Sequence, residues 1–301
     1  MNSLGIIVLD KPSGVASNKA MSHLKRQFGI RKMGFLGTLD PLATGVLPVF
    51  VGKATKLIPA FEGSDKTYRV EIRLGVTTDT FDAEGKVLER RPINGLTKEA
   101  VQRVVKGFAG TMQQTAPAFS AIKHGGIPAY KLARAGKEVP ERHRTVHLHD
   151  LEIESIALPH VTFQVTCSSG TYMRSLAADI GEALAVGAHV TALRRVRCGP
   201  CFELAHSWTL DRIDEAIAAG DSAFLHNPAS FLSDYWPFAV DGADIPALRQ
   251  GRTIALPGQP SAPGDADKVK AMSSDGELLA IGKATPGLQG IWGFQPSRVL
   301  V

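Results

Sequence analysis

The chain has 301 residues, of which 44% are apolar and 7% aromatic, and this composition is typical of a globular protein with a buried core. No apolar run approaches the roughly 20 residues of a membrane-spanning helix, and residues 1–10 lack the basic segment and cleavage site of a signal peptide. We therefore expect a cytoplasmic protein. Three cysteines are too few for a secreted disulfide scaffold.

The net charge of +5 is unevenly distributed along the chain. Residues 1–60 carry eight basic and two acidic side chains, whereas residues 240–301 carry six of each. A basic first fifth and a neutral tail indicate a polyanionic partner that binds mainly to the N-terminal part.

Hydrophobic periodicity predicts a mixed succession of strands and helices. In chain order we expect a strand at 5–9, a helix capped by Ser17 or Asn18, a glycine-rich loop at 34–45, strands at 46–51 and 67–74, a helix at 97–108, paired strands at 148–156 and 161–167, and a helix at 172–184.

Residues 113–145 interrupt this pattern with a long basic segment. Six basic and two acidic side chains lie among Pro and Gly residues, and Tyr130, Leu132 and Ala133 predict one short helix. Such a segment within a compact domain is either disordered or a binding loop. Because the N-terminal region is also basic, we favour the binding loop.

The last part of the chain predicts a separate small β module. Short apolar runs broken by Gly and Pro lie at 238–240, 253–256, 278–281 and 291–294. We therefore divide the chain into a domain at 1–235, which contains the basic insertion, and a β module at 236–301.

Asp40 lies in the most informative stretch, Gly34-Phe35-Leu36-Gly37-Thr38-Leu39-Asp40-Pro41-Leu42-Ala43-Thr44-Gly45-Val46-Leu47-Pro48. Pro41 disfavours helical dihedrals at Asp40, so the carboxylate is expected in a turn between glycines that let a ligand or another backbone approach. Aspartate is common in turns without any chemical role, and spacing alone favours that interpretation.

This stretch resembles the catalytic signature of the bacterial tRNA pseudouridine synthase B (TruB) family. Five further stretches resemble the same family in the same order, at residues 9–14, 65–70, 119–123, 169–176 and 187–195. The resemblance implies an α+β pseudouridine synthase fold with a mixed, largely antiparallel central sheet, followed by a PUA-like RNA-binding β module. It also implies an isomerase that converts uridine 55 in the T-loop of tRNA into pseudouridine.

The resemblance also implies roles for individual residues. Asp40 would be the essential catalytic carboxylate, Arg174 its ion-pair partner, and Tyr68 the ring that stacks on the uracil and shuttles a proton. Tyr172 would line the pocket, and Asp82 would lie near the flipped base. The phosphate-binding candidates are Lys11, Lys19, Lys56, Lys123 and Arg144. Without the resemblance, we would interpret Tyr68 as a core residue of a strand and Arg174 as a solvated charge on a helix.

The implied chemistry detaches uracil from the sugar, turns it and rejoins it through carbon. No atoms or electrons are exchanged with a second reactant, so the reaction needs no redox cofactor or metal. It needs an oriented carboxylate near the sugar carbon, much as in glycoside hydrolysis. The base must first be flipped out of the RNA stack. The implied partner is the tRNA T-arm, bound by a monomer with neither a membrane nor an obligate protein partner.

One position departs from the family pattern. The family usually has a histidine in the Gly-His-Thr-Gly segment before the aspartate, where this chain has Phe35. A phenyl ring can stack or wedge but cannot hydrogen-bond a base or phosphate. The departure bears on base flipping, and it keeps open the alternative of a non-catalytic protein that binds and folds tRNA.

Two other patterns suggest different chemistry. Cys198-Gly199-Pro200-Cys201 spells a thioredoxin-type motif, but it lacks the expected context of a strand that leads into a helix. His147 and His149 would share one side of a strand as a metal pair, but no third ligand stands out. We favour neither a redox nor a metal site.

Overall fold

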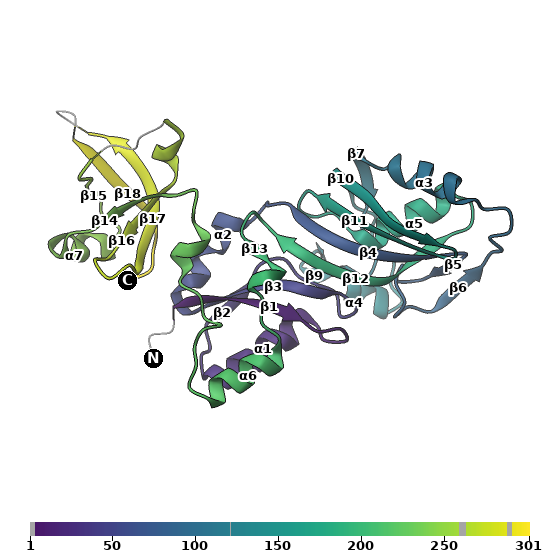
Figure 1. Ribbon diagram of the computed structural model, residues 1–301, viewed down its shortest axis with the longest axis horizontal. Helices are drawn as coiled ribbons and strands as arrows, with labels where there is room; N and C mark the ends of the chain where they lie inside the picture. Colours follow the sequence, from purple (N-terminus) through teal and green to yellow (C-terminus); the bar gives the residue numbers. More distant parts are fainter. Residues whose placement is uncertain (1–3, 121, 259–262, 288–290) are drawn as a thin grey trace.

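The computed structural model describes residues 4–120, 122–258, 263–287 and 291–301. Figure 1 shows an elongated molecule in which a large sheet with flanking helices lies beside a smaller β structure formed by the end of the chain. Among the described residues, no helix is long and apolar enough to cross a membrane.

The larger part is built on a nine-stranded mixed sheet, which confirms the predicted α+β fold. Its strand order is β1-β3-β12-β4-β11-β10-β7, with β2 paired to β3 and β13 paired to β12. The β12–β3 pair is parallel and the other pairs are antiparallel. The strands are β1 Gly5–Lys11, β2 Met33–Phe35, β3 Thr44–Val51, β4 Lys66–Leu74, β7 Gly110–Thr115, β10 His143–Ala157, β11 His160–Cys167, β12 Ala188–Cys198 and β13 Phe202–Glu203.

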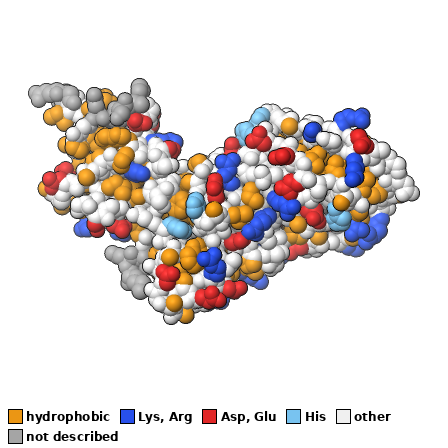
Figure 2. Space-filling view, in the orientation of Figure 1, with side chains coloured by type: hydrophobic (Ala, Val, Ile, Leu, Met, Phe, Trp, Pro, Cys, Tyr) orange, Lys and Arg blue, Asp and Glu red, His pale blue; other side chains and the backbone are white. Residues whose placement is uncertain are grey.

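Side-chain alternation along β4 separates the two faces of this sheet. Tyr68, Val70 and Ile72 are buried in the main core, which also includes Val101 of α3 (Lys98–Lys106) and Leu176 of α5 (Met173–Ala183). The β4 side chains on the other face are polar, and Arg69 among them pairs with Glu154. Basic and acidic side chains are interspersed over this part of the molecule in Figure 2.

The first helix, α1 (Ser17–Phe28), is capped differently from the prediction. Ala16 is the N-cap, and no side chain accepts a hydrogen bond there. The Ser17 hydroxyl instead donates to the Leu39 carbonyl at 2.8 Å and accepts from the Leu39 amide at 2.9 Å. Ser17 therefore fastens the loop that contains Asp40. The helix packs beside α6 (Leu210–Ala218), where His23 bonds Asp214 at 2.8 Å.

Short elements complete this part of the molecule. The short helix α2 (Ile58–Phe61) follows β3, and β5 and β6 form a hairpin after β4. The basic insertion begins in β7, contains a small hairpin and helix α4, and returns in β10, so the predicted short helix is confirmed. The remaining bounds are β5 Val76–Thr78, β6 Val87–Arg90, β8 Lys123–His124, β9 Ile127–Pro128 and α4 Ala129–Arg134.

The end of the chain forms a five-stranded sheet in the order β14-β16-β17-β18-β15. Four of its strands fall at the predicted apolar runs, whereas β16 was not anticipated. This five-stranded sheet has its own core around Leu248, Val269 and Phe294. A second cluster joins Leu278 and Leu300 to Phe50 of the large sheet. The elements are β14 Trp236–Ala239, α7 Ile245–Arg249, β15 Ile254–Ala255, β16 Val269–Met272, β17 Leu278–Pro286 and β18 Trp292–Val299.

Candidate active site

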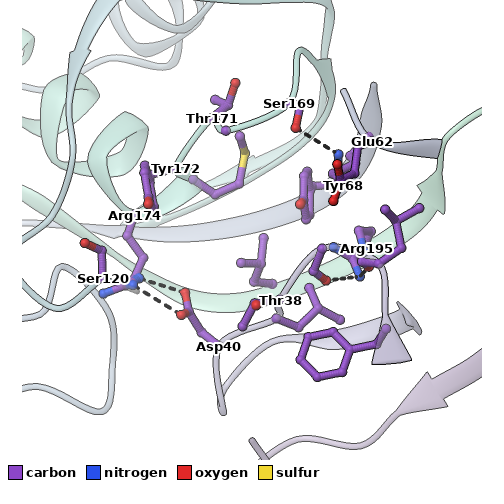
Figure 3. A pocket seen from close by; sticks show the side chains of 18 of the residues that line it. Thr38, Asp40, Glu62, Tyr68, Ser120, Ser169, Thr171, Tyr172, Arg174 and Arg195 are labelled. Atoms are coloured by element: carbon purple, nitrogen blue, oxygen red, sulfur yellow. Dashed lines mark hydrogen bonds and ion pairs between the residues drawn. The ribbon is translucent and has the colours of Figure 1, made fainter. Parts of the chain in front are cut away.

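A cavity of about 520 Å³ opens beside the loop between β2 and β3. Figure 3 shows that side chains from distant parts of the sequence point into it. The cavity brings together Asp40, Tyr68, Tyr172 and Arg174, four of the residues that the sequence predicts for the site. Phe35 also lines it.

The loop that contains Asp40 is held mainly through its backbone. The ammonium of buried Lys11 donates to the carbonyls of Val15 at 2.6 Å and of Pro41 at 3.2 Å. Gly45 ends the loop with a φ of 97°, and a Cβ there would lie 2.2 Å from the Arg195 carbonyl oxygen. Glycine is therefore required at Gly45, because β12 packs directly against the backbone.

Arg174 binds the Asp40 carboxylate in a bidentate pair. Its Nε donates to Oδ2 at 2.9 Å and its Nη2 donates to Oδ1 at 3.2 Å. The Arg174 side chain is only 5% exposed, whereas that of Asp40 is 37% exposed. Arg174 also donates to the carbonyls of Thr80 at 3.0 Å and Phe119 at 2.9 Å. The guanidinium is therefore fixed, and it orients a carboxylate that remains accessible to a ligand.

Asp82 is a second carboxylate beside Arg174. Its Oδ2 lies 3.6 Å from the Nε of Arg174, and its side chain is 6% exposed. Its Oδ1 accepts hydrogen bonds from the Thr80 hydroxyl at 2.6 Å and the Glu84 amide at 3.1 Å. Asp82 therefore contacts the same guanidinium that binds Asp40. It is not among the residues that line the cavity.

The two tyrosines come from different elements. Tyr68 is on β4, with 8% of its surface exposed, and burial raises its pKa to about 12 while the nearby Arg195 charge opposes this shift. Burial therefore favours the neutral form of the phenol. Tyr172 precedes α5, and its backbone amide and carbonyl both bond the side-chain amide of Gln114.

The five phosphate candidates have different environments. Lys19 is exposed on α1, and Arg144 donates to the Gly170 carbonyl at 3.2 Å beside the cavity. Lys11 is fully buried, and its ammonium binds backbone carbonyls. The Lys56 ammonium is bonded to the Val299 carbonyl of β18. The Lys123 side chain lies outside the described part of the structure.

The sequence interpretation gave no role to three further residues at the cavity. Lys66, Ser120 and Arg195 line it and are at most 8% exposed. The Ser120 hydroxyl and the Arg195 Nη1 have no hydrogen-bond partner in the described structure. For Arg195 a signal was present, because strand alternation places it on the same face as buried Leu193.

The residues of the two alternative patterns are not among those that line the cavity. Cys198 is buried at the end of β12, and burial raises the pKa of the Cys201 thiol to about 12, which disfavours the reactive thiolate. The rings of His147 and His149 lie 4.5 Å apart, and His149 pairs with Asp65. Within the described ranges, no group of three His, Cys, Asp or Glu side chains could hold a metal ion.

Comparisons with known proteins address the family and the fold. The profile of the TruB family pseudouridylate synthase (N terminal domain) matches residues 25–173, and that of the tRNA pseudouridylate synthase B C-terminal domain matches residues 174–227. Two solved structures share the fold. An H/ACA RNP bound to a substrate RNA containing 2′-deoxyuridine has a TM-score of 0.72 and 26% sequence identity, and the match covers 100% of this chain and 86% of that chain. A Cbf5-Nop10-Gar1 complex has a TM-score of 0.71 and 27% identity, and the match covers 99% of this chain and 85% of that chain.

The fold and site are therefore those of a pseudouridine synthase, an enzyme that isomerises uridine to pseudouridine in RNA. A tRNA pseudouridine synthase B of Burkholderia pseudomallei (strain 668) is 41% identical over 99% of this chain and 97% of its own length. A tRNA pseudouridine synthase B of Xanthomonas campestris pv. campestris (strain B100) is 41% identical over 92% of this chain and 89% of its own length. The chain belongs to the TruB family.

Proposed function

We propose that this pseudouridine synthase acts on tRNA and modifies uridine 55 in the T-loop. The observation that carries the proposal is the Asp40–Arg174 pair, 2.9 Å from Nε to Oδ2, at a cavity that Tyr68 also lines. The relatives named as tRNA pseudouridine synthase B and the basic first 60 residues support tRNA as the substrate.

Each residue of this group has a part in the proposed reaction. Asp40 attacks, or stabilises positive charge at, the reacting centre as the glycosidic bond breaks. Arg174 holds the carboxylate in place through its bidentate pair. The Tyr68 ring stacks on the flipped uracil, and its hydroxyl exchanges a proton. Tyr172 forms one wall of the cavity, and Asp82 holds Arg174 from behind.

Basic side chains hold the RNA. We assign Lys19, Lys123 and Arg144 to phosphates, and the insertion at 113–145 closes over the T-arm. Phe35 wedges into the space near the flipped base by stacking, since it has no hydrogen-bonding group. Lys11 and Lys56 are not assigned to phosphates, because both ammonium groups already bind backbone carbonyls.

The proposed organisation is a catalytic domain at 1–235 and a PUA-like RNA-binding module at 236–301. The match to the family profiles ends at residue 227, and the first strand of the five-stranded sheet begins at Trp236, which supports this boundary. We propose that the protein acts as a monomer in the cytoplasm, where its tRNA substrate is found.

The experiment that tests this function compares the wild type with Asp40→Asn on unmodified tRNA. We expect pseudouridine at the T-loop uridine with the wild type and none with Asp40→Asn, because the amide cannot supply negative charge. Both proteins should bind the tRNA with similar affinity. Product from neither protein, with tRNA binding retained, would support the alternative of a non-catalytic tRNA-binding or tRNA-folding protein; equal product from both would remove Asp40 from the mechanism.

A further inference from the structure

One end of the cavity contains two buried cations that have no carboxylate partner. Arg195 is fully buried and Lys66 is 8% exposed, and both line the cavity. Neither forms an ion pair with any carboxylate among the residues that the structure describes. An uncompensated charge is costly to bury, so two together indicate that negative charge arrives from outside the protein.

Neutral oxygen atoms hold both cations in place. Arg195 donates from Nε to the Val46 carbonyl at 2.7 Å and from Nη2 to the Gly37 carbonyl at 2.8 Å. Its remaining terminal nitrogen, Nη1, is buried and has no hydrogen-bond partner among the residues that the structure describes. The Lys66 ammonium donates to the Ser64 carbonyl at 2.7 Å and approaches the Ser169 hydroxyl at 3.4 Å.

The two side chains meet at Gly37. A Cβ on this glycine would lie 3.1 Å from Nη1 of Arg195 and 3.2 Å from Cε of Lys66. The φ of Gly37 is 67°, which favours glycine over any residue with a Cβ. Both positive groups therefore share one region of the cavity, and no side chain at position 37 separates them.

This region lies away from the Asp40 carboxylate, on the far side of Tyr68. Arg195 is the cross-strand neighbour of Tyr68 in the β12–β4 pair. Figure 3 shows Asp40 and Arg174 at one end of the cavity, Arg195 at the other, and Tyr68 between them. At the Asp40 end the carboxylate is paired with Arg174, whereas Lys66 and Arg195 leave the opposite end positive.

Two carboxylates lie near this end of the cavity. Glu62 lines the cavity but is exposed, and its charge is not among the causes that shift the pKa of Lys66. Burial is the largest cause and lowers that pKa, and the neighbouring Arg195 charge lowers it further. The Asp65 charge, the smallest cause, raises it, and Asp65 itself pairs with His149. Arg195 also acts on Tyr68, where its charge opposes the rise in pKa caused by burial. The positive field therefore reaches the ring against which a uracil would lie.

We propose that Lys66 and Arg195 stabilise the uracil ring as an anion during the interval in which it is detached from the sugar. This inference rests on the proposed function. When the C1′–N1 bond breaks, its electron pair stays on the ring, and the Asp40 carboxylate meets the positive charge at C1′. C5 of the turned ring then bonds to C1′, C5 loses a proton and N1 gains one, so no atom is gained or lost.

The polarity of the cavity matches this separation of charge. Negative charge on a detached uracil spreads over N1, O2 and O4, and fixed cations in a water-poor site stabilise developing charge more strongly than water does. Because the ring returns to a neutral form after rejoining, Lys66 and Arg195 act on the intermediate more than on bound substrate or product. Arg195 is a positioning residue, since its free nitrogen is covered by other protein atoms.

The test measures the single-turnover rate of pseudouridine formation and, separately, the dissociation constant for the same tRNA. The variants are Lys66→Met and Arg195→Gln, each of which removes one buried charge. We expect each rate to fall roughly 100-fold, as when one stabilising donor is removed from an active site, with the dissociation constant changed less than about threefold. Lys66→Arg, which retains the charge, should keep the rate within about tenfold of the wild type.

Arg197→Gln is the matched control. Arg197 is on the same strand and its Nε donates to the Thr67 hydroxyl, so it does not line the cavity. Its single-turnover rate should equal that of the wild type. Thermal unfolding checks the fold of each variant, and Lys66→Met decides the outcome if Arg195→Gln does not fold.

The outcomes separate this inference from the function on which it rests. Unchanged rates in a folded Lys66→Met and Arg195→Gln, with an active wild type, overturn the inference alone. A loss of tRNA affinity that accounts for the whole loss of rate also overturns it, because the two cations would then bind substrate. An inactive wild type overturns the proposed function and this inference together.

Discussion

Asp40 depends on several residues that hold its loop in place and never contact its carboxylate. Ser17 binds the backbone of Leu39, Lys11 binds the carbonyl of Pro41, and Arg195 binds the carbonyl of Gly37. Because these contacts fix the backbone on both sides of Asp40, the pair with Arg174 needs little reorganisation when a substrate arrives.

Lys11 provides a prediction at the scale of a single residue. Burial lowers the pKa of its ammonium from 10.5 to about 8, although the Asp40 and Glu84 charges oppose the shift. The unfolded state therefore binds more protons than the folded state between pH 8 and 10.5, and the contribution of Lys11 to stability rises with pH across that window. Between pH 7 and 9.5, the unfolding free energy of the wild type should gain roughly 2 kcal/mol relative to that of Lys11→Met.

Denaturant unfolding at both pH values measures this difference. Lys19→Met is the control, because it removes an exposed lysine from α1 and should show no such gain. A wild-type advantage that falls as pH rises would contradict the prediction. It would mean that the three carbonyl contacts of the ammonium outweigh the cost of burying its charge.

At the scale of elements, β7 and α5 form the frame that aims Arg174. The Gln114 side chain on β7 donates to the Tyr172 carbonyl at 3.0 Å and accepts from the Tyr172 amide at 2.8 Å. The N-terminus of α5 has no side-chain cap of its own, so this amide group takes the place of one. Arg174 is two residues after Tyr172, in the first turn of α5. The Gln114–Tyr172 contact therefore fixes the backbone position from which the Arg174 side chain extends.

Gln114→Ala should therefore weaken both the fold and the site. Gln114 is 1% exposed, and its removal leaves the Tyr172 amide unpaired, whereas the Tyr172 carbonyl keeps its bond from the Leu176 amide. We expect the loss to cost about 1–3 kcal/mol. The single-turnover rate should fall as well, because α5 is no longer fixed to β7. The control is Gln113→Ala, since exposed Gln113 bonds only the Thr145 hydroxyl and its loss should cost less than about 0.5 kcal/mol. Equal stability losses in the two variants would contradict this account.

At the scale of the whole molecule, the two sheets are joined by a shared apolar cluster. Leu278 and Leu300 near the end of the chain pack in one cluster with Phe50 of β3. The Lys56 ammonium adds a bond to the Val299 carbonyl. The small sheet therefore stabilises the larger part at the base of β3, the strand that follows the Asp40 loop.

This shared cluster predicts cooperative unfolding of the whole chain. Leu278 is fully buried, and Leu278→Ala should cost about 2–5 kcal/mol by leaving a cavity. Calorimetry should show one unfolding transition that moves to a lower temperature. Leu88→Ala, at a side chain in β6 that is 65% exposed, should leave the transition in place. Two transitions, of which only one moves, would mean that the sheets unfold independently.

The sequence by itself predicted most elements and proposed Asp40 as the catalytic group. Strand and helix periodicities depend on local alternation between core and solvent, so β4, β11 and α5 lay within a few residues of their predicted ranges. Strand β16 was missed because Lys270 interrupts its apolar residues, so it contains no continuous apolar run of the kind that marked the other strands of the small sheet. The family resemblance supplied Asp40, Tyr68 and Arg174, which spacing alone did not distinguish from a turn residue, a core residue and a surface charge.

Only the tertiary structure decided which charges are free to meet a ligand. Lys11 and Lys19 look alike in the sequence, yet one is buried among carbonyls and the other is exposed. Arg195 and Arg197 are two positions apart, but a register shift in β12 directs one to Tyr68 and the other to Thr67. The role of a charged side chain depends on its burial and partners, and these come from segments that are distant in the sequence. The positive end of the cavity was therefore visible only once β4, β12 and the Asp40 loop had been brought together.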